Sequence, residues 1–138
     1  MLATMLATMP ASMLALDTNV LLRLLVGDDA AQARAAEKRV SAGAWVSHLV
    51  LAETFWVLSS VYERTNAQLA AAIELLLQHE HLLIQDPHVV RAALTHFQKK
   101  PKLGFSDCLV LEIARHAGHL PLISFDKALG KLAGVAPV

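Results

Sequence analysis

The stretch Met13-Leu-Ala-Leu-Asp-Thr-Asn-Val-Leu-Leu-Arg23 decides the fold. Its apolar start, residues 13–16, has the length of a buried strand, Asp17 ends that strand, and a helical pattern follows. Short apolar segments of the same kind recur at residues 45–47, 82–85, 122–125 and 134–138. Because helix-length segments separate these strands, right-handed crossovers are required. We therefore expect an α/β domain with three layers, α/β/α, around a central parallel sheet.

The intervals between the strands carry helix signals. Asp28 or Asp29 can cap a helix over residues 30–40, and an apolar helix is expected over residues 49–62. The remaining predicted helices are residues 68–79 with Asn66 as cap, residues 87–97 after Asp86, and a helix capped by Ser106 that runs to residue 117 and ends at Gly118.

Length and composition limit the classes of protein that the chain can form. The 138 residues suit one domain, which we place at residues 13–138, and the repetitive residues 1–12 are expected to be a disordered N-terminal extension. The 12 basic and 12 acidic residues cancel, so any contact with nucleic acid must come from a local patch. No apolar run is long enough to span a bilayer, and a single cysteine suits a reducing compartment, so we expect a cytoplasmic protein without a membrane partner.

Four acidic residues stand in apolar surroundings without an obvious cationic partner: Asp17, Glu53, Asp107 and Asp126. The case is clearest for Glu53, because no other formally charged side chain occurs in residues 48–62. Burying a carboxylate unpaired would cost on the order of several kcal/mol, so a cation is expected nearby. Glu37 and Glu112, by contrast, have arginines at helical spacing and are interpreted as structural residues on solvated helix faces.

The placement of these acids along the chain predicts a shared site. Asp17 and Asp126 each follow a strand, and Asp107 and Glu53 lie in early turns of neighbouring helices. Ligands in such folds bind beyond the carboxyl ends of the strands, so the four carboxylates could meet there. Oxygen-only ligation suits Mg²⁺ or Mn²⁺, and such ions can promote phosphodiester hydrolysis. Each Asp is also a common helix cap, so taken singly none of them distinguishes a site from a cap.

At this point the sequence resembles a known family. Residues 16–23, the lone Glu53, and the segments 105–108 and 124–127 are similar to the motifs of PIN-domain nucleases, in particular VapC-type toxins of bacterial toxin–antitoxin pairs. The resemblance implies an endoribonuclease that depends on Mg²⁺ or Mn²⁺, forms a homodimer and is inhibited by a cognate antitoxin. It also implies that Asp17, Glu53, Asp107 and Asp126 are the catalytic and metal-binding acids, with Asn19 and Ser124 in support.

Substrate contacts and alternative functions remain open in the sequence. Lys99, Lys100 and Lys102 form a compact basic loop that either binds RNA phosphates or is simply solvated. One alternative is a metal-dependent phosphohydrolase with Asp17 as nucleophile, although Asn19 stands where such enzymes have a second Asp. Another is a PIN-type scaffold that binds RNA or a protein partner without cutting. Covalent catalysis through Cys108 lacks an activating base in the sequence.

Overall fold

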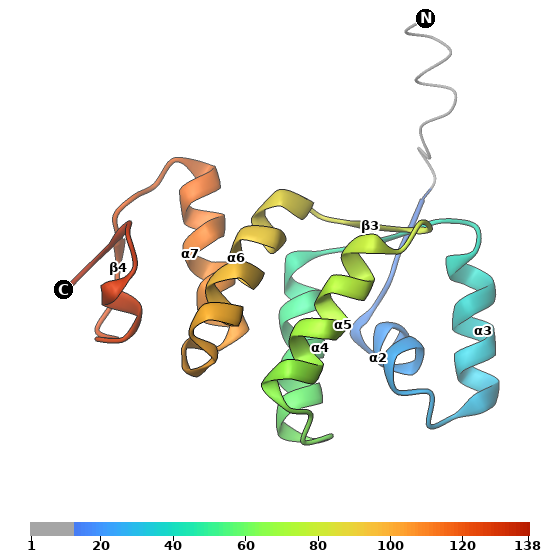
Figure 1. The fold of residues 1–138 in the computed structure, drawn as a ribbon. Helices are drawn as coiled ribbons and strands as arrows, with labels where there is room; N and C mark the ends of the chain where they lie inside the picture. Colours follow the sequence, from blue (N-terminus) through green and yellow to red (C-terminus); the bar gives the residue numbers. More distant parts are fainter. Residues whose placement is uncertain (1–12) are drawn as a thin grey trace, which may run out of the picture.

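The computed structural model describes residues 13–138, and Figure 1 shows the arrangement of their helices and strands. The predicted N-terminal extension, residues 1–12, lies outside this description. The elements follow in the order β1 (Leu14–Ala15), α2 (Thr18–Val26), α3 (Ala30–Val40), β2 (Ala44–Val46), α4 (His48–Ser60), α5 (Asn66–Gln78), β3 (Leu82–Ile84), α6 (Pro87–Lys99), η1 (Pro101–Leu103), α7 (Phe105–Ala117), β4 (Leu122–Ile123), η2 (Leu129–Lys131) and β5 (Val135–Ala136). None of the helices in this part of the chain is long and apolar enough to cross a membrane.

The strands are parallel, as predicted, but they form two sheets. β1, β2 and β3 make a three-stranded sheet in that order, and β4 pairs with β5 in a separate two-stranded sheet. The predicted fold class, α/β with a parallel sheet, is confirmed, and a strand occurs at every predicted position. The expectation of one continuous sheet differs from the structure, because β4 lies on the far side of α6 and α7 from β1 (Figure 1).

The core lies where the helices pack on the first sheet and on one another. Leu21, Leu51, Ile73 and Leu94 are almost completely buried and come from four different helices. Val46 and Ile84, on β2 and β3, bury their side chains in the same cluster. The apolar faces predicted from helical periodicity therefore meet in one core, which holds α2 and α4 against each other.

Of the predicted helix caps, two are confirmed and two are wrong, and a fifth, Asp86, occupies the N-cap position of α6 without a side-chain hydrogen bond. Asp29 caps α3 by accepting a hydrogen bond from a backbone N–H, and Gly118 ends α7 in the left-handed conformation. The cap of α5 is Thr65 instead of Asn66, because Thr65 forms a reciprocal capping box with Gln68. Gly104 occupies the N-cap position of α7, and the predicted cap, Ser106, lies inside that helix.

Aromatic packing fixes the start of α7. The ring of Phe105 meets that of Phe55 in α4 edge-on, with ring centroids 5.8 Å apart, and that of Phe97 in α6 at 6.2 Å. All three side chains are buried. Edge-to-face contacts of this kind add to the apolar burial and restrict ring orientation. The first turn of α7, which carries Asp107, is therefore held at a fixed position relative to α4 and α6.

A buried charge network fixes the other half of α7. Glu112 is only 6% exposed, and its carboxylate is 3.0 Å from the His96 ring in α6 and 3.2 Å from Arg115. Arg115 also donates a 2.7 Å hydrogen bond to the carbonyl of Ala133. The prediction of a solvated face at Glu112 is therefore wrong, although its structural role holds. The helical spacing revealed Arg115, but it could not reveal His96, which lies on another helix.

Replacing Glu112 by Gln should lower the free energy of unfolding by about 1–2 kcal/mol, because the hydrogen bonds of His96 and Arg115 to a buried charge are weakened and Arg115 is partly solvent-screened. Urea unfolding followed by circular dichroism measures this change. The matched control is Glu37→Gln on the exposed face of α3, which should stay within about 0.5 kcal/mol of the parent chain. Equal effects of the two substitutions would contradict the role of Glu112.

Candidate functional site

The first two predicted acids are linked through one threonine. Asp17 is the N-cap of α2, and its Oδ1 accepts a hydrogen bond of 2.7 Å from the backbone N–H of Thr18. The Thr18 hydroxyl donates in turn to Glu53 Oε2 in α4, at 2.9 Å. The packing of α2 on α4 thus brings Asp17 and Glu53 to the same place. Sequence reasoning gave Thr18 no role, although a hydroxyl directly after the first acid was the available signal.

The other two acids form a second pair. Asp107 lies in the first turn of α7, and its pKa is raised, first by partial burial and then by the nearby Asp126 carboxylate. Ser124 Oγ accepts a hydrogen bond of 3.0 Å from the backbone N–H of Asp126. Asp126 Oδ1 accepts two more from backbone N–H groups, of Ala128 at 2.9 Å and Leu129 at 3.1 Å. Ser124 therefore helps to position the loop that carries Asp126.

The structure does not gather the four acids into a single cluster. Within residues 13–138, no group of three or more His, Cys, Asp or Glu side chains lies close enough together to hold a metal ion. The acids form two pairs, Asp17 with Glu53 and Asp107 with Asp126, just as the strands form two separate sheets. The first pair lies beside the β1–β2–β3 sheet, and Asp126 of the second follows β4. A four-carboxylate site therefore requires the two sheets to come together.

The solvent exposure of these acids changes the electrostatic argument made from the sequence. Asp17, Glu53, Asp107 and Asp126 are all exposed, and none of them takes part in an ion pair in the described part of the chain. The expectation that burial forces a cation on Glu53 is wrong, because this side chain leaves α4 on a solvated face. What remains is a set of carboxylates without protein cations, and solvent or an added cation can reach them.

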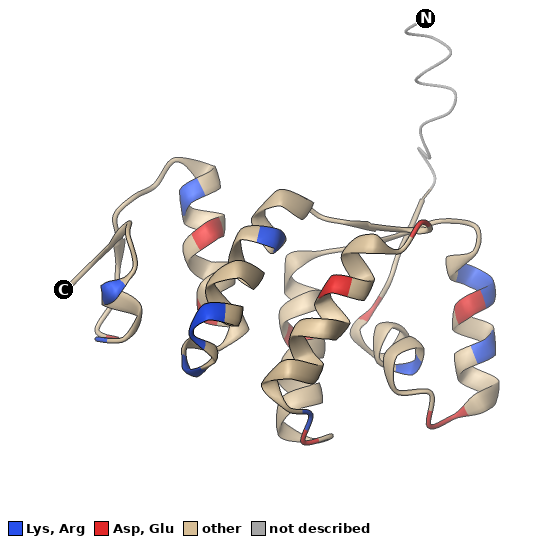
Figure 2. Cartoon of the chain, viewed as in Figure 1, with Lys and Arg blue, Asp and Glu red and all other residues tan. Residues whose placement is uncertain are grey.

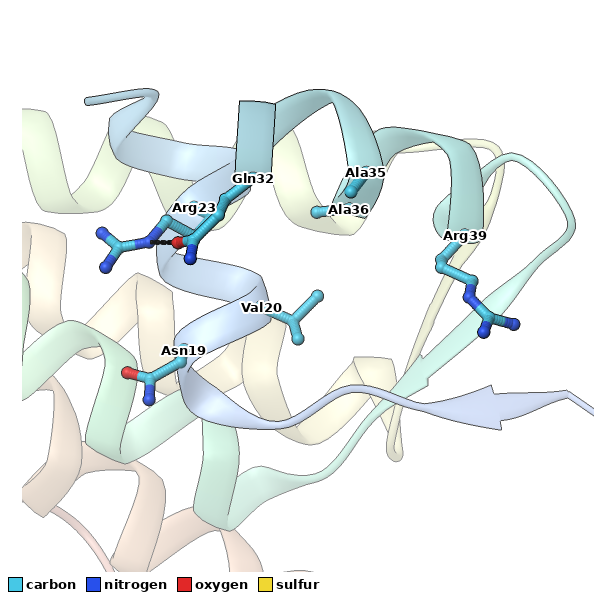
Figure 3. A pocket seen from close by; sticks show the side chains of 7 residues that line it. All are labelled: Asn19, Val20, Arg23, Gln32, Ala35, Ala36 and Arg39. Carbon is cyan, nitrogen blue, oxygen red and sulfur yellow. Dashed lines mark hydrogen bonds between the residues drawn. The ribbon is translucent and has the colours of Figure 1, made fainter. Parts of the chain in front are cut away.

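A hollow of about 400 Å³ lies between α2 and α3, beside Asn19 (Figure 3). Arg23 and Arg39 contribute guanidinium groups to its lining, and small side chains such as Ala36 form an apolar part of its wall. Arg23 is held by a 3.0 Å ion pair with Asp28. Asn19 is exposed and makes no hydrogen bond to the acids among residues 13–138, so the structure places it at this hollow instead.

A second hollow, of about 350 Å³, reaches Asp107 from the surface between α4, α5 and α7. Trp56 lines it and is 65% exposed. Phe97 and Phe105 form part of its wall, and Ser106 lies at the same opening as Asp107. An aromatic wall beside a carboxylate can hold a planar ring close to the acid.

The basic loop lies at the same end of α7 as Asp107. Lys99 ends α6, and Lys100 and Lys102 flank Pro101 just before Gly104 begins the next helix. Figure 2 shows these cations gathered at the turn between α6 and α7. All three are exposed and form no ion pair in the part of the chain that the structure describes, so their charges are available to a solvent-borne anion.

Cys108 has no features of a nucleophile. Its side chain is completely buried, and this burial, with a smaller contribution from Asp107, raises the pKa of the thiol to about 11. Since the thiolate is the reactive form, the group is protonated at neutral pH and closed to solvent. The prediction against covalent catalysis at this residue agrees with its environment.

Comparison with known proteins identifies the family. The PIN domain family matches residues 14–135, nearly the whole described chain, and the protein belongs to this family. PIN domains have a nuclease-type fold; they generally act on nucleic acids as hydrolases and often use divalent metals. No curated protein matches the sequence. The chain is thus a PIN domain, with the nuclease-type fold of that family.

Gly104 controls how α7 begins beside the second acid pair. Its φ of 77° and ψ of 142° are strained for any residue with a side chain. Gly104→Ala should therefore lower the free energy of unfolding by about 1–2 kcal/mol in urea titrations. Gly130→Ala is the matched control, because no atom lies within 4 Å of an added Cβ and its φ is not in the left-handed range. Equal stability of the two variants would show that the strain at Gly104 is absent.

Proposed function

We propose that this protein is a Mg²⁺- or Mn²⁺-dependent endoribonuclease and the toxin of a toxin–antitoxin pair. The observation that carries the proposal is that the four acids lie in two pairs and have no cationic partner in the described part of the chain. In a chain of the PIN family, Asp17 and Glu53 are joined through Thr18, and Asp107 and Asp126 share a second location. None of these acids is neutralised by a protein cation within residues 13–138. A role as helix cap would explain Asp17, but it would not explain Glu53, which lies inside a different helix.

The donor chemistry of these residues fits a hard divalent cation. Every candidate ligand is a carboxylate oxygen, which suits Mg²⁺ and Mn²⁺ better than zinc, and such ions keep several waters when one or two carboxylates bind them. Each acid pair therefore has the donors for one ion, with Asp17 and Glu53 on one side and Asp107 and Asp126 on the other. When bound, such ions activate a water and stabilise the leaving oxygen of a phosphodiester.

Neighbouring groups orient these carboxylates for metal binding. Thr18 holds one oxygen of Glu53, and the backbone N–H groups of Ala128 and Leu129 hold one oxygen of Asp126, so each carboxylate has a set orientation. The pKa of Asp107 is raised first by partial burial and then by repulsion from Asp126, and a bound cation would relieve the repulsion. Outer contacts of this kind tune metal ligands in many proteins.

Substrate contacts are proposed at the same end of the molecule. The ammonium groups of Lys99, Lys100 and Lys102 would bind RNA phosphates, which fixes the strand without reading its sequence. The hollow that Trp56 lines would take an unstacked base beside Asp107. An RNA strand bound in this way would cross the first turn of α7, next to the proposed chemistry.

The proposed partners account for the exposed apolar surface. Leu49, Trp56 and Leu75 are each 65–69% exposed, although they belong to otherwise well-packed helices. Such surface marks a protein interaction site. We assign it to a cognate antitoxin, which would cover the acids, and to a homodimer in the cytoplasm. Expression of this chain alone should therefore arrest growth, and co-expression of the neighbouring small gene product should relieve the arrest.

A non-catalytic PIN scaffold is the second candidate, and one observation favours it: the two acid pairs do not form one cluster within the described chain. A scaffold would bind RNA through the same lysines but would not depend on the carboxylates. Substitution of the acids therefore distinguishes the two functions, because it should abolish the activity of a nuclease and leave RNA binding by a scaffold unchanged. No observation in the structure favours a phosphohydrolase that uses Asp17 as nucleophile.

Neutral substitutions at the acids should abolish cleavage. Asp17→Asn, Glu53→Gln, Asp107→Asn and Asp126→Asn should each reduce the rate of RNA cleavage by about 100-fold or more, because loss of a metal ligand exceeds the effect of loss of an outer contact. The assay uses purified, partner-free protein, total RNA and Mg²⁺ or Mn²⁺. A chelator should stop the reaction of the parent protein.

The control for this experiment is Glu37→Gln, which removes the same charge from an exposed face of α3 and should cleave RNA at the parental rate. Circular dichroism establishes that each variant is folded. Cleavage that persists in chelator, or in all four acid variants, would exclude the proposed nuclease. Binding of RNA without cleavage by the parent protein would favour the scaffold.

A further inference from the structure

Among the described residues, the outer strands of both sheets have a free edge, and for β1 and β4 the hydrogen-bond pattern shows which residues face it. In the described part of the chain, β1 pairs only with β2, and β4 pairs only with β5. The N–H of Leu16 donates to Trp45, so the polar groups of Ala15 point away from β2. The N–H groups of Leu122 and Ser124 donate to β5, so those of Ile123 point to the other side.

The free edges are also apolar. Leu14 on β1 is 52% exposed, Ile123 on β4 is 54% exposed, and Phe125 just beyond β4 is 86% exposed. A sheet edge that presents unpaired backbone groups and exposed aliphatic side chains is a template for another strand. β1 and β4 both belong to parallel sheets, so each offers the other a partner of the right kind.

The two edges of one chain are held apart. β4 lies beyond α6 and α7 when viewed from β1 (Figure 1). α7 is fixed to α6 by Phe105 at one end and by Glu112 with His96 at the other. The 2.7 Å bond from Arg115 to Ala133 ties the C-terminal strands to α7. While these contacts hold, β4 cannot reach β1 of its own chain.

We propose that β4 of one copy pairs in parallel with β1 of a second copy, and reciprocally, so that two chains exchange residues 119–138. The exchange would give each half of the dimer one continuous parallel sheet, in the order β3–β2–β1–β4–β5. Because the exchange is mutual, it closes about a two-fold axis and leaves neither β1 nor β4 free. The occupant of the apolar β1 edge is thus a second copy of this chain.

The exchange has a consequence for the acids, and this part rests on the proposed function. Asp17 directly follows β1 and Asp126 follows β4 within a few residues, so pairing these strands brings their carboxyl ends side by side. Asp17 and Glu53 of one copy would then face Asp126 of the other. The separation of the acids within one chain becomes a requirement for the dimer, with each site composed of two halves.

Cross-linking tests the exchange without any assay of RNA cleavage. Leu14→Cys and Ile123→Cys are made as separate full-length variants with different tags, unfolded, mixed, refolded and treated with a short thiol cross-linker; the buried Cys108 stays in place. A cross-linked dimer that carries both tags is expected. Leu83→Cys replaces Leu14→Cys in the control, since it lies 49% exposed on the opposite free edge, and should give none.

The double variant, with Leu14→Cys and Ile123→Cys in one chain, tests whether β1 and β4 pair within a single chain. A link within a single chain, found by mass spectrometry together with a monomeric mass in light scattering, would overturn the exchange. A chain that stays monomeric and gives no link between these positions would overturn it as well. Both readouts remain valid if the protein cuts no RNA, so failure of the exchange and failure of the proposed function are distinguishable.

A mixing experiment then tests the composite site. Asp17→Asn and Asp126→Asn, each inactive alone, are unfolded together and refolded. In a mixed dimer with exchanged halves, one site carries both substitutions and the other carries none. Random pairing should restore about one quarter of the parental cleavage rate. If the parent protein is active and the mixture is not, each site is built within one chain and the composite site is refuted.

Discussion

The packing of α7 on α6 is the constraint on which the rest of this structure depends. Phe105 fixes the start of α7 between two other aromatic rings, and Glu112 fixes its second half through a buried charge network. Because Arg115 also holds the C-terminal strands to α7, the position of this helix decides where Asp126 lies. The same packing that builds a stable α/β domain thus separates Asp107 and Asp126 from Asp17 and Glu53.

Local patterns in the sequence were sufficient to predict the helices and strands and to indicate the family. The apolar run before Asp17 predicted β1, the boundaries of α3 were predicted correctly, and the acid-bearing motifs led to the PIN family that the comparison identified. These predictions rest on short-range rules, in which strand length, helical periodicity and capping depend on neighbours within a few residues. Even the pairing of Asp107 with Asp126 follows from their places at the ends of consecutive elements.

The features that could not be predicted depend on contacts distant in the sequence. Spacing identifies an apolar neighbourhood around Glu53, but the solvated side of α4 emerges only once α2 and α7 are packed on it. Glu112 has a cationic neighbour on its own helix, yet its burial depends on His96 from α6. The division of the sheet likewise has no local signal, because β4 carries the same apolar pattern whether it pairs with β1 of its own chain or with that of another.

If these carboxylates hydrolyse RNA with a metal-activated water, as we propose, the chemical groups at the product ends should show it. RNA cleaved by the purified protein in Mn²⁺ and water enriched in oxygen-18 should carry 5′-phosphate ends that contain the heavy isotope, with 3′-hydroxyl ends opposite. Mass spectrometry of the fragments reads both ends. Products that end in a 2′,3′-cyclic phosphate without incorporated oxygen would show attack by the ribose hydroxyl and would contradict the account.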